Sequence, residues 1–191
     1  MHSDELQTPI VKRMIETYIK KIASSTTQGD AREESYYGNF ANFLESFAEE
    51  TGKKHIQITT LPKKTEAGNP DFRVWDGKQQ IVGYIEAKKP GENLNLIEDS
   101  EQLKRYRSTF PNFILTDFYE FRLYRNGNLF DKVLLARPFI AQKLKTVPPV
   151  EHKESSSRFL RNPFPSRCPT YLPQNISLWN LQSVPVFCAM K

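Results

Sequence analysis

Residues 70–88 read Pro-Asp-Phe-Arg-Val-Trp-Asp-Gly-Lys-Gln-Gln-Ile-Val-Gly-Tyr-Ile-Glu-Ala-Lys, and this stretch decides the fold. The dipeptide Asp76-Gly77 separates two short runs rich in strand-forming residues and favours a hairpin turn. The first strand is predicted to start at Asp71. The second is apolar over residues 81–85 before the sequence changes to Glu-Ala-Lys. We therefore expect two neighbouring strands with charged residues at a common end.

Three charged side chains fall at that end of the predicted hairpin. Glu86 and Lys88 point to the same face of the second strand, because side chains alternate with a period of two. Asp71, on the first strand, could meet them there. Two carboxylates can bind a hard divalent cation such as Mg²⁺, and a lysine beside the ion can orient a water for attack on phosphorus. The alternative interpretation is an ordinary surface hairpin with charged residues at a strand end.

The pattern Pro70-Asp71, followed by Glu86-Ala87-Lys88, resembles the PD-(D/E)xK motif of a superfamily of nucleases. The resemblance implies an α/β fold with a restriction-endonuclease-like core, in which helices flank a central mixed β-sheet. It also implies that Asp71 and Glu86 ligate one or two Mg²⁺ ions, for which Mn²⁺ can substitute. The main-chain carbonyl of Ala87 would be a further ligand. Lys88 would orient the attacking water and stabilise charge on the phosphoryl group.

A helix predicted over residues 96–108 strengthens this resemblance. Gln102 and Tyr106 are four residues apart and therefore share one face of the helix. In this position they resemble the QxxxY motif of a subset that includes RecB-like enzymes and the cleavage domains of several restriction-modification systems. In that subset the glutamine and tyrosine lie beside the active site and hold the DNA backbone. Lys104 and Arg105, on the same helix, would add DNA contacts.

Two amphipathic helices are predicted before the hairpin. Thr8-Pro9 is a typical helix start, and apolar residues recur at helical spacing over residues 10–22. Residues 24–30 are polar and predict a loop. The second helix carries an aromatic stripe over residues 36–47 and ends near Gly52.

Glu34 lies in the first turn of that second helix. In nucleases that resemble this chain, an acidic residue on a helix before the first core strand often faces the metal. Glu34 is therefore a tentative further ligand, with Glu45 as the competing candidate. The alternative is that Glu34 only complements the helix dipole.

Further strands are predicted at residues 55–61, 112–116, 119–124 and 129–135. The last two are joined by Asn126-Gly127, a strong hairpin signal. The expected element order is two helices, three strands, one helix and three strands, which gives an α/β fold with a mixed sheet.

The sequence predicts a domain boundary near residue 145. Residues 1–145 form the expected nuclease domain. Prolines and serines interrupt residues 146–191, for which we expect poor order. Relatives of this arrangement continue into further domains, so one hypothesis is that the tail is a truncation or frameshift product.

The length, net charge and composition of the chain narrow the class of protein. The chain has 191 residues and a formal net charge of +5, which suits a polyanionic partner. It shows no apolar run long enough for a membrane span and no signal-peptide pattern, so we expect a cytoplasmic protein that does not interact with membranes. The two cysteines and three histidines form no zinc pattern, and a disulfide is disfavoured.

By resemblance, the function expected is that of a Mg²⁺-dependent endonuclease domain acting on double-stranded DNA. The restriction-modification systems concerned are of the type I, type ISP or type IIG-like, methyltransferase-fused kind. The sequence shows no Walker loop, no methyltransferase signature and no base-reading motif. Recognition would therefore come from a methyltransferase and target-recognition domain or subunit, and cleavage of both strands from a transient dimer on DNA. Two alternatives stay open: a catalytically silent DNA-binding remnant, and a repair or processing nuclease.

Overall fold

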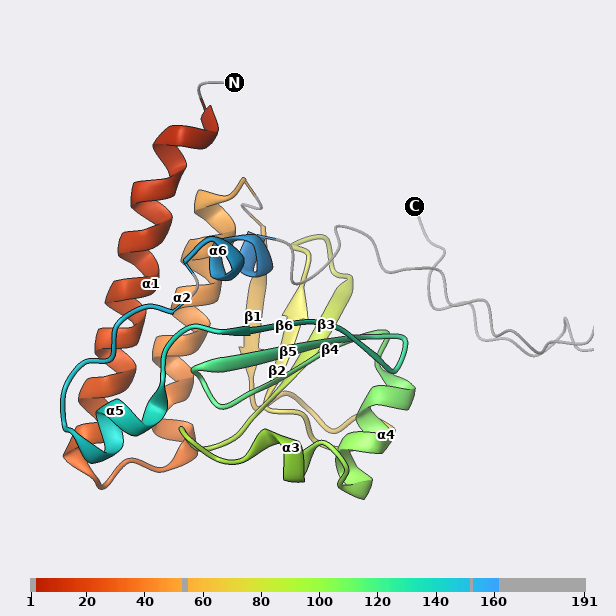
Figure 1. The fold of residues 1–191 in the computed structure, drawn as a ribbon. Helices are drawn as coiled ribbons and strands as arrows, with labels where there is room; N and C mark the ends of the chain where they lie inside the picture. Colours follow the sequence, from red (N-terminus) through yellow and green to blue (C-terminus); the bar gives the residue numbers. More distant parts are fainter. Residues whose placement is uncertain (1–2, 53–54, 152, 162–191) are drawn as a thin grey trace, which may run out of the picture.

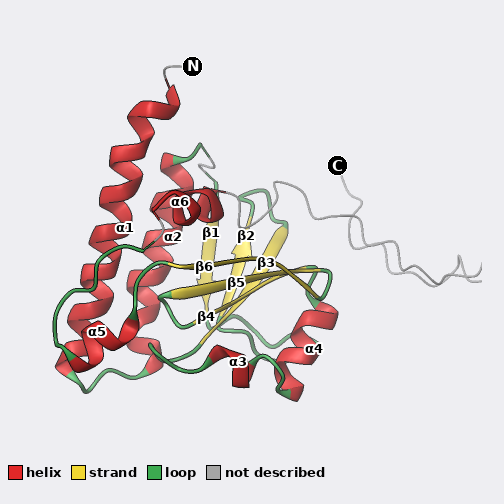
Figure 2. Ribbon diagram, in the orientation of Figure 1, coloured by secondary structure: helices red, strands yellow, loops and turns green. Residues whose placement is uncertain are grey.

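A single six-stranded sheet forms the centre of the protein. The structure is a computed structural model and describes residues 3–52, 55–151 and 153–161. The strands lie in sequence order across the sheet, and Figures 1 and 2 show them between two groups of helices. They are β1 Gln57–Thr60, β2 Phe72–Trp75, β3 Ile81–Ala87, β4 Asn112–Thr116, β5 Glu120–Arg125 and β6 Asn128–Leu134.

The mixed character of the sheet comes from the pairing of β3 with β4. These two strands are parallel, whereas the other neighbouring pairs are antiparallel. A parallel pair requires a crossover, and the helices α3 (Leu94–Ile97) and α4 (Glu101–Thr109) supply it. β4 is buried along its whole length, as the apolar run at residues 112–116 predicts. The predicted α/β architecture, with a mixed sheet flanked by helices, is confirmed.

One face of the sheet is covered by helices α1 (Ser3–Gln28) and α2 (Tyr37–Glu50), with the short 3₁₀ helix η1 (Glu33–Tyr36) between them. This face holds the larger apolar core, which is rich in aromatic rings and includes Tyr18, Phe40 and Phe72. Helices α3 and α4 cover the other face around a smaller cluster that includes Leu103, Tyr106 and Phe113. Figure 1 shows α1 and α2 on one side of the sheet and α4 on the other.

The first helix is longer at both ends than the sequence predicts. It begins at Ser3 instead of next to Pro9, which lies inside the helix. The loop predicted at residues 24–30 begins too early, because α1 continues to Gln28 and only residues 29–30 of this range are non-helical. The hydroxyls of Thr26 and Thr27 donate to the carbonyls of Ile22 and Ser24, which accommodates these polar residues within the helix.

The helix predicted over residues 96–108 is divided into two. Ser100 caps α4, since its hydroxyl accepts a hydrogen bond from the Leu103 amide. Asn93 caps α3 in the same way through Asn95. The break turns α4 so that its buried side lies against the end of β3.

The boundary predicted at residue 145 lies too early. Helix α5 (Pro138–Lys143) and helix α6 (Lys153–Arg161) follow the sheet. Phe159 and Leu160 of α6 are buried in the larger core, and α6 packs against β6. The folded unit therefore includes residues 153–161. The remainder of the predicted tail, residues 162–191, lies outside the described residues.

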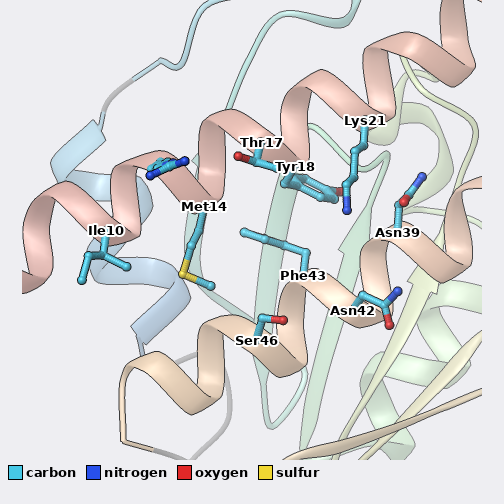
Figure 3. A pocket seen from close by; sticks show the side chains of 10 residues that line it. Ile10, Met14, Thr17, Tyr18, Lys21, Asn39, Asn42, Phe43 and Ser46 are labelled. Carbon is cyan, nitrogen blue, oxygen red and sulfur yellow. The ribbon is translucent and has the colours of Figure 1, made fainter.

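A cleft of about 290 Å³ lies between α1 and α2. Figure 3 shows Met14, Tyr18 and Phe43 among its lining side chains. It contains none of the residues predicted to form the active site. Among the described helices, none is both long and apolar enough to cross a membrane.

Candidate active site

The two predicted catalytic carboxylates meet across the β2–β3 pair. Phe72 is paired with Ile85, so one further step of the antiparallel register places Asp71 opposite Glu86. Asp71 also accepts a hydrogen bond from the backbone amide of Ala87, with an N···O distance of 2.8 Å. The strand predicted to begin at Asp71 begins one residue later, and Asp71 lies just before it. The hairpin therefore brings both acids to one end of the sheet.

Glu86 and Lys88 form a close ion pair at this point. The Lys88 Nζ donates to Glu86 Oε1 over 2.7 Å. The side chain of Glu86 is 4% exposed and that of Lys88 19%. The other carboxylate oxygen, Glu86 Oε2, is buried and has no hydrogen-bond partner among the described residues. Burying an unpaired carboxylate oxygen is costly, so this atom is suited to bind a ligand that the polypeptide does not supply.

Helix α4 brings the predicted Gln-x-x-x-Tyr pair to the same carboxylate. Gln102 Nε2 lies 3.3 Å from Glu86 Oε1 and 3.1 Å from the Tyr106 hydroxyl. Tyr106 is fully buried, whereas Gln102 is exposed. Gly68 (φ +135°) lies against the Tyr106 ring, where an added Cβ would be 3.1 Å from the hydroxyl oxygen.

Lys104 and Arg105, the two residues of α4 predicted to contact DNA, are exposed. Lys104 forms an ion pair with Glu101 at 3.2 Å. Arg105 donates through Nε to the carbonyl of Ala67 over 2.8 Å, which ties the loop before β2 to the helix. These partners lie outside the carboxylate cluster, so a role of either residue in DNA binding stays a prediction.

An acidic residue on η1 also faces the site, but it is Glu33 instead of the predicted Glu34. Glu33 is half-buried and interacts electrostatically with Lys88 and Asp71, whereas Glu34 is exposed. The Tyr37 hydroxyl donates to Glu33 Oε1 over 3.0 Å. The competing candidate, Glu45, accepts a hydrogen bond from the Ile58 amide and so connects α2 to β1.

The electrostatics of the cluster are unusual for surface carboxylates. Burial and the neighbouring Asp71 raise the pKa of Glu86 to about 7, against the opposing effect of Lys88. Burial alone would lower the pKa of Lys88, but the adjacent Glu86 carboxylate raises it. Burial also raises the pKa of Glu33, although Lys88 opposes this. Lys88 is therefore an ammonium ion at neutral pH, while Glu86 binds and releases a proton near neutrality.

These residues fit a hard divalent cation, although they do not form a complete set of ligands. No group of three or more His, Cys, Asp or Glu side chains that could hold a metal occurs in the part of the chain that the structure describes. Asp71 and Glu86 nevertheless supply adjacent carboxylates, and Glu86 Oε2 has no partner among those residues. Mg²⁺ prefers oxygen ligands and usually keeps several waters, so two carboxylates are sufficient.

A buried aspartate that sequence analysis misses holds the turn after Lys88. Asp117, at the end of β4, accepts backbone hydrogen bonds from Gly91, Tyr119 and Glu120. Burial raises the pKa of Asp117 to about 6, although the three amide donors oppose the shift. The Lys88 amide donates to the Thr116 carbonyl over 2.7 Å, so β4 fixes the chain at the end of β3.

The sheet order, its helical layers and the placement of the carboxylates define a restriction-endonuclease-like α/β fold. Among solved structures, the chain is similar to one in "cryoEM structure DrdV-DNA complex", with a TM-score of 0.55 and 22% sequence identity. The match covers 79% of this chain and 14% of that chain, so this sequence spans a small part of the longer neighbour. No protein-family model and no curated protein sequence matches this chain.

Proposed function

We propose that this protein is a Mg²⁺-dependent DNA endonuclease. The observation that carries the proposal is the buried Glu86 Oε2 atom, which has no hydrogen-bond partner among the described residues and lies in a cluster with Asp71 and Lys88. The similar fold in a structure solved with DNA supports the choice of substrate. A bound Mg²⁺ would polarise the scissile phosphate and lower the pKa of a bound water.

Each residue of the cluster has a role that follows from its surroundings. Asp71 and Glu86 would hold the cation, with the Ala87 carbonyl as a neutral ligand. Lys88 would donate hydrogen bonds to the attacking water and to the phosphoryl oxygens, because its raised pKa keeps it charged and unsuited to act as a base. Glu33 replaces Glu34 as the further acidic group that could bind the ion through water.

Gln102 would position the DNA strand. Its amide is exposed, and it bridges Glu86 and Tyr106, so a phosphate or sugar contact at this point would be coupled to the catalytic carboxylate. Lys104 and Arg105 would contact the backbone farther along the same helix. Such contacts hold DNA without reading its sequence.

The biological context proposed is restriction-modification. Sequence recognition would come from a methyltransferase and target-recognition domain or subunit. Cleavage of both strands would require two active sites, and therefore a transient dimer on DNA. These features are proposed by resemblance.

Plasmid nicking in Mg²⁺ tests the catalytic assignment. We expect Lys88→Ala to reduce the nicking rate by about 100-fold or more, since removing one donor to transition-state charge has effects of this size. Lys78→Ala is the matched control, because Lys78 is exposed and lies at the opposite end of β3. Thermal melting of both variants checks that they are folded. Equal nicking by Lys88→Ala and the unchanged protein would remove Lys88 from the mechanism.

The same proteins separate the alternatives. A chain that binds duplex DNA but nicks no plasmid in Mg²⁺ or Mn²⁺ would be a silent DNA-binding remnant. A chain that cleaves only branched, flapped or single-stranded substrates would be a repair or processing nuclease.

A further inference from the structure

A second cleft, of about 200 Å³, lies next to the candidate active site. It is formed where the end of α1, the segment before η1, the turn after β3 and the end of α5 meet. Lys89, which directly follows Lys88, is part of its wall. The lining residues are Thr26, Gly29, Ala31, Tyr36, Lys89, Pro90, Gln142 and Lys145.

The lining of this cleft is cationic. Lys89 and Lys145 are its two charged residues, and none of the described residues that line it is acidic. Neither lysine forms an ion pair with another residue that the structure describes. Thr26 Oγ1 and the Tyr36 hydroxyl, 3.3 Å apart, add neutral hydrogen-bonding groups. The chemistry suits an anion that carries several oxygen acceptors.

The wall that carries Lys89 is held in place from two sides. The amide of Gly91 donates to the buried Asp117 carboxylate over 2.9 Å, and the Gln142 side chain donates to the Pro90 carbonyl. Gly91 has φ +78°, and an added Cβ would lie 2.7 Å from Gln142 Nε2. A side chain at this position would displace the end of the Gln142 side chain and would adopt a backbone conformation that favours glycine. The two hydrogen bonds hold the turn against β4 and α5, so the cleft is formed before any ligand binds.

The second lysine occupies a backbone position that usually favours glycine. Lys145 has φ +55° and follows the last residue of α5 and its cap, Leu144. Glycine or asparagine is usual in this left-handed conformation at a helix end. A long cationic side chain held in a sparsely populated conformation points to a functional use of that side chain.

We infer that this cleft binds a phosphate of the DNA backbone one or more nucleotides away from the bond that is cleaved. The inference rests on the proposed function, because it assigns the path of the same substrate. Lys88 and Lys89 are consecutive, but the Lys88 side chain contacts the Glu86 carboxylate, whereas Lys89 lines the cleft. Lys88 would contact the DNA strand at the catalytic cluster, and Lys89 would contact the same DNA strand in the cleft. The DNA strand would therefore be held at two neighbouring points by one turn of the protein.

The test is the salt dependence of duplex binding. Fluorescence anisotropy of a labelled duplex of about 20 base pairs is measured in EDTA between about 50 and 200 mM NaCl. Removing one phosphate contact should reduce the slope of log K against log salt by about 0.9. Lys89→Ala with Lys145→Gly should therefore reduce the slope by about 1 to 2 and weaken binding several-fold. Glycine is used at residue 145 because it adopts positive φ without strain.

The matched control is Lys12→Ala with Lys78→Ala, which removes the same charge. Both residues are exposed. Lys12 lies roughly 20 Å along α1 from Thr26. Lys78 precedes β3, and the length of β3, roughly 20 Å, separates it from the end of the strand that is followed by Lys89. The control should retain the original slope. Thermal melting confirms the fold of each protein, and Lys145→Gly alone provides a second variant that relieves backbone strain.

Three results would overturn the inference. If the unchanged protein binds DNA with a steep slope and the cleft variant keeps that slope, the cleft proposal fails while the proposed function stands. If both double variants lower the slope equally, the effect is one of total charge and the cleft has no special part. If the unchanged protein shows no salt-dependent binding to duplex, the proposed function fails, and the cleft proposal fails with it.

Discussion

The two faces of the sheet are built from different chemistry. The face under α1 and α2 is packed with aromatic rings: Tyr18 stacks on Phe43 with centroids 4.2 Å apart, and Phe40 contacts Phe72, Phe118 and Phe121. The face under α3 and α4 also has an apolar cluster, but it includes buried charge. The difference indicates that the face under α1 and α2 mainly stabilises the fold, whereas the face under α3 and α4 positions the residues of the candidate site.

The buried charge on the α3–α4 face is centred on Arg122 of β5. Its guanidinium donates to Glu120 over 2.6 Å and to Glu98 over 2.7 Å. A third bond, to Asn95 Oδ1, measures 2.7 Å, and the Tyr124 hydroxyl donates to the same Glu98 carboxylate. Because Glu98 lies between α3 and α4, this network fixes the crossover and therefore the helix that carries Gln102.

The largest effect is expected from the aromatic face. Phe40 has no exposed surface, and Phe40→Ala should reduce the free energy of unfolding by about 3–5 kcal/mol, because it removes buried area and leaves a cavity. Urea unfolding measures the loss. Phe130→Ala is the control: Phe130 is 60% exposed, and its substitution should cost about 1 kcal/mol or less. The nicking rate of the folded fraction of Phe40→Ala should be nearly unchanged. A large decrease in that rate would show that the aromatic face also positions the candidate site, contrary to the comparison.

An intermediate effect is expected from the polar network. Arg122→Met should cost about 2–3 kcal/mol of stability, since it leaves a partly buried glutamate without its cation. Unlike Phe40→Ala, it should also slow nicking by the folded protein, because α4 is no longer fixed. Arg137→Met removes an exposed ion pair with Glu151 and should change stability by less than about 1 kcal/mol. Stability and nicking rate are measured on the same preparations. A stability decrease with an unaltered nicking rate would show that the network has no positioning role.

The smallest effect is expected from pH. The raised pKa of Glu86, about 7, means that the folded protein favours the protonated carboxyl. Mg²⁺ binding requires the ionised form, so affinity should increase roughly tenfold between about pH 6 and pH 8. The same shift makes the metal-free protein lose stability as the pH rises from 4.5, the ordinary pKa of a glutamate, through about 7. Isothermal titration calorimetry with MgCl₂ measures the affinity. Glu86→Gln should abolish the pH dependence, and a flat profile in the unchanged protein would remove Glu86 as the titrating ligand.

The hairpins of this fold can be predicted where local sequence alone determines the turn. Asn126-Gly127 forms the expected turn between β5 and β6, with both residues at positive φ. The Asp76 turn is longer than a two-residue turn, because Trp75 pairs with Ile81. Within it, the Asp76 side chain accepts hydrogen bonds from the amides of Lys78 and Gln80. The strands on either side are still predictable, because their apolar pattern does not depend on the details of the turn.

The candidate site can be predicted only in part, and the choice between Glu33 and Glu34 shows why. The sequence indicates that an acidic residue precedes the aromatic helix. The direction in which the side chain of this acidic residue points depends on whether the first turn is α-helical or 3₁₀, because the two kinds of helix differ in rotation per residue. η1 is a 3₁₀ turn, and it directs Glu33 to the cluster. Asp117 escapes prediction because its role consists of backbone contacts that no spacing rule describes.

Helix α6 escapes prediction for another physical reason. The surrounding prolines and serines suggest irregular chain, and a nine-residue helix is marginal in isolation. Its stability comes from Phe159 and Leu160 against the core, which is a tertiary effect.

The parallel pairing of β3 with β4 has a consequence for folding kinetics. Strands β1 to β3 and strands β4 to β6 are two meanders, each joined by antiparallel neighbours, and the β3–β4 pair is the junction between them. Closing that junction requires the ordering of the whole α3–α4 segment, so we expect it to form late. Asp71 and Glu86 belong to one meander and Asp117 to the other. A newly made chain would therefore fix the turn after Lys88 against Asp117, and so complete the candidate site, only in the final stage of folding.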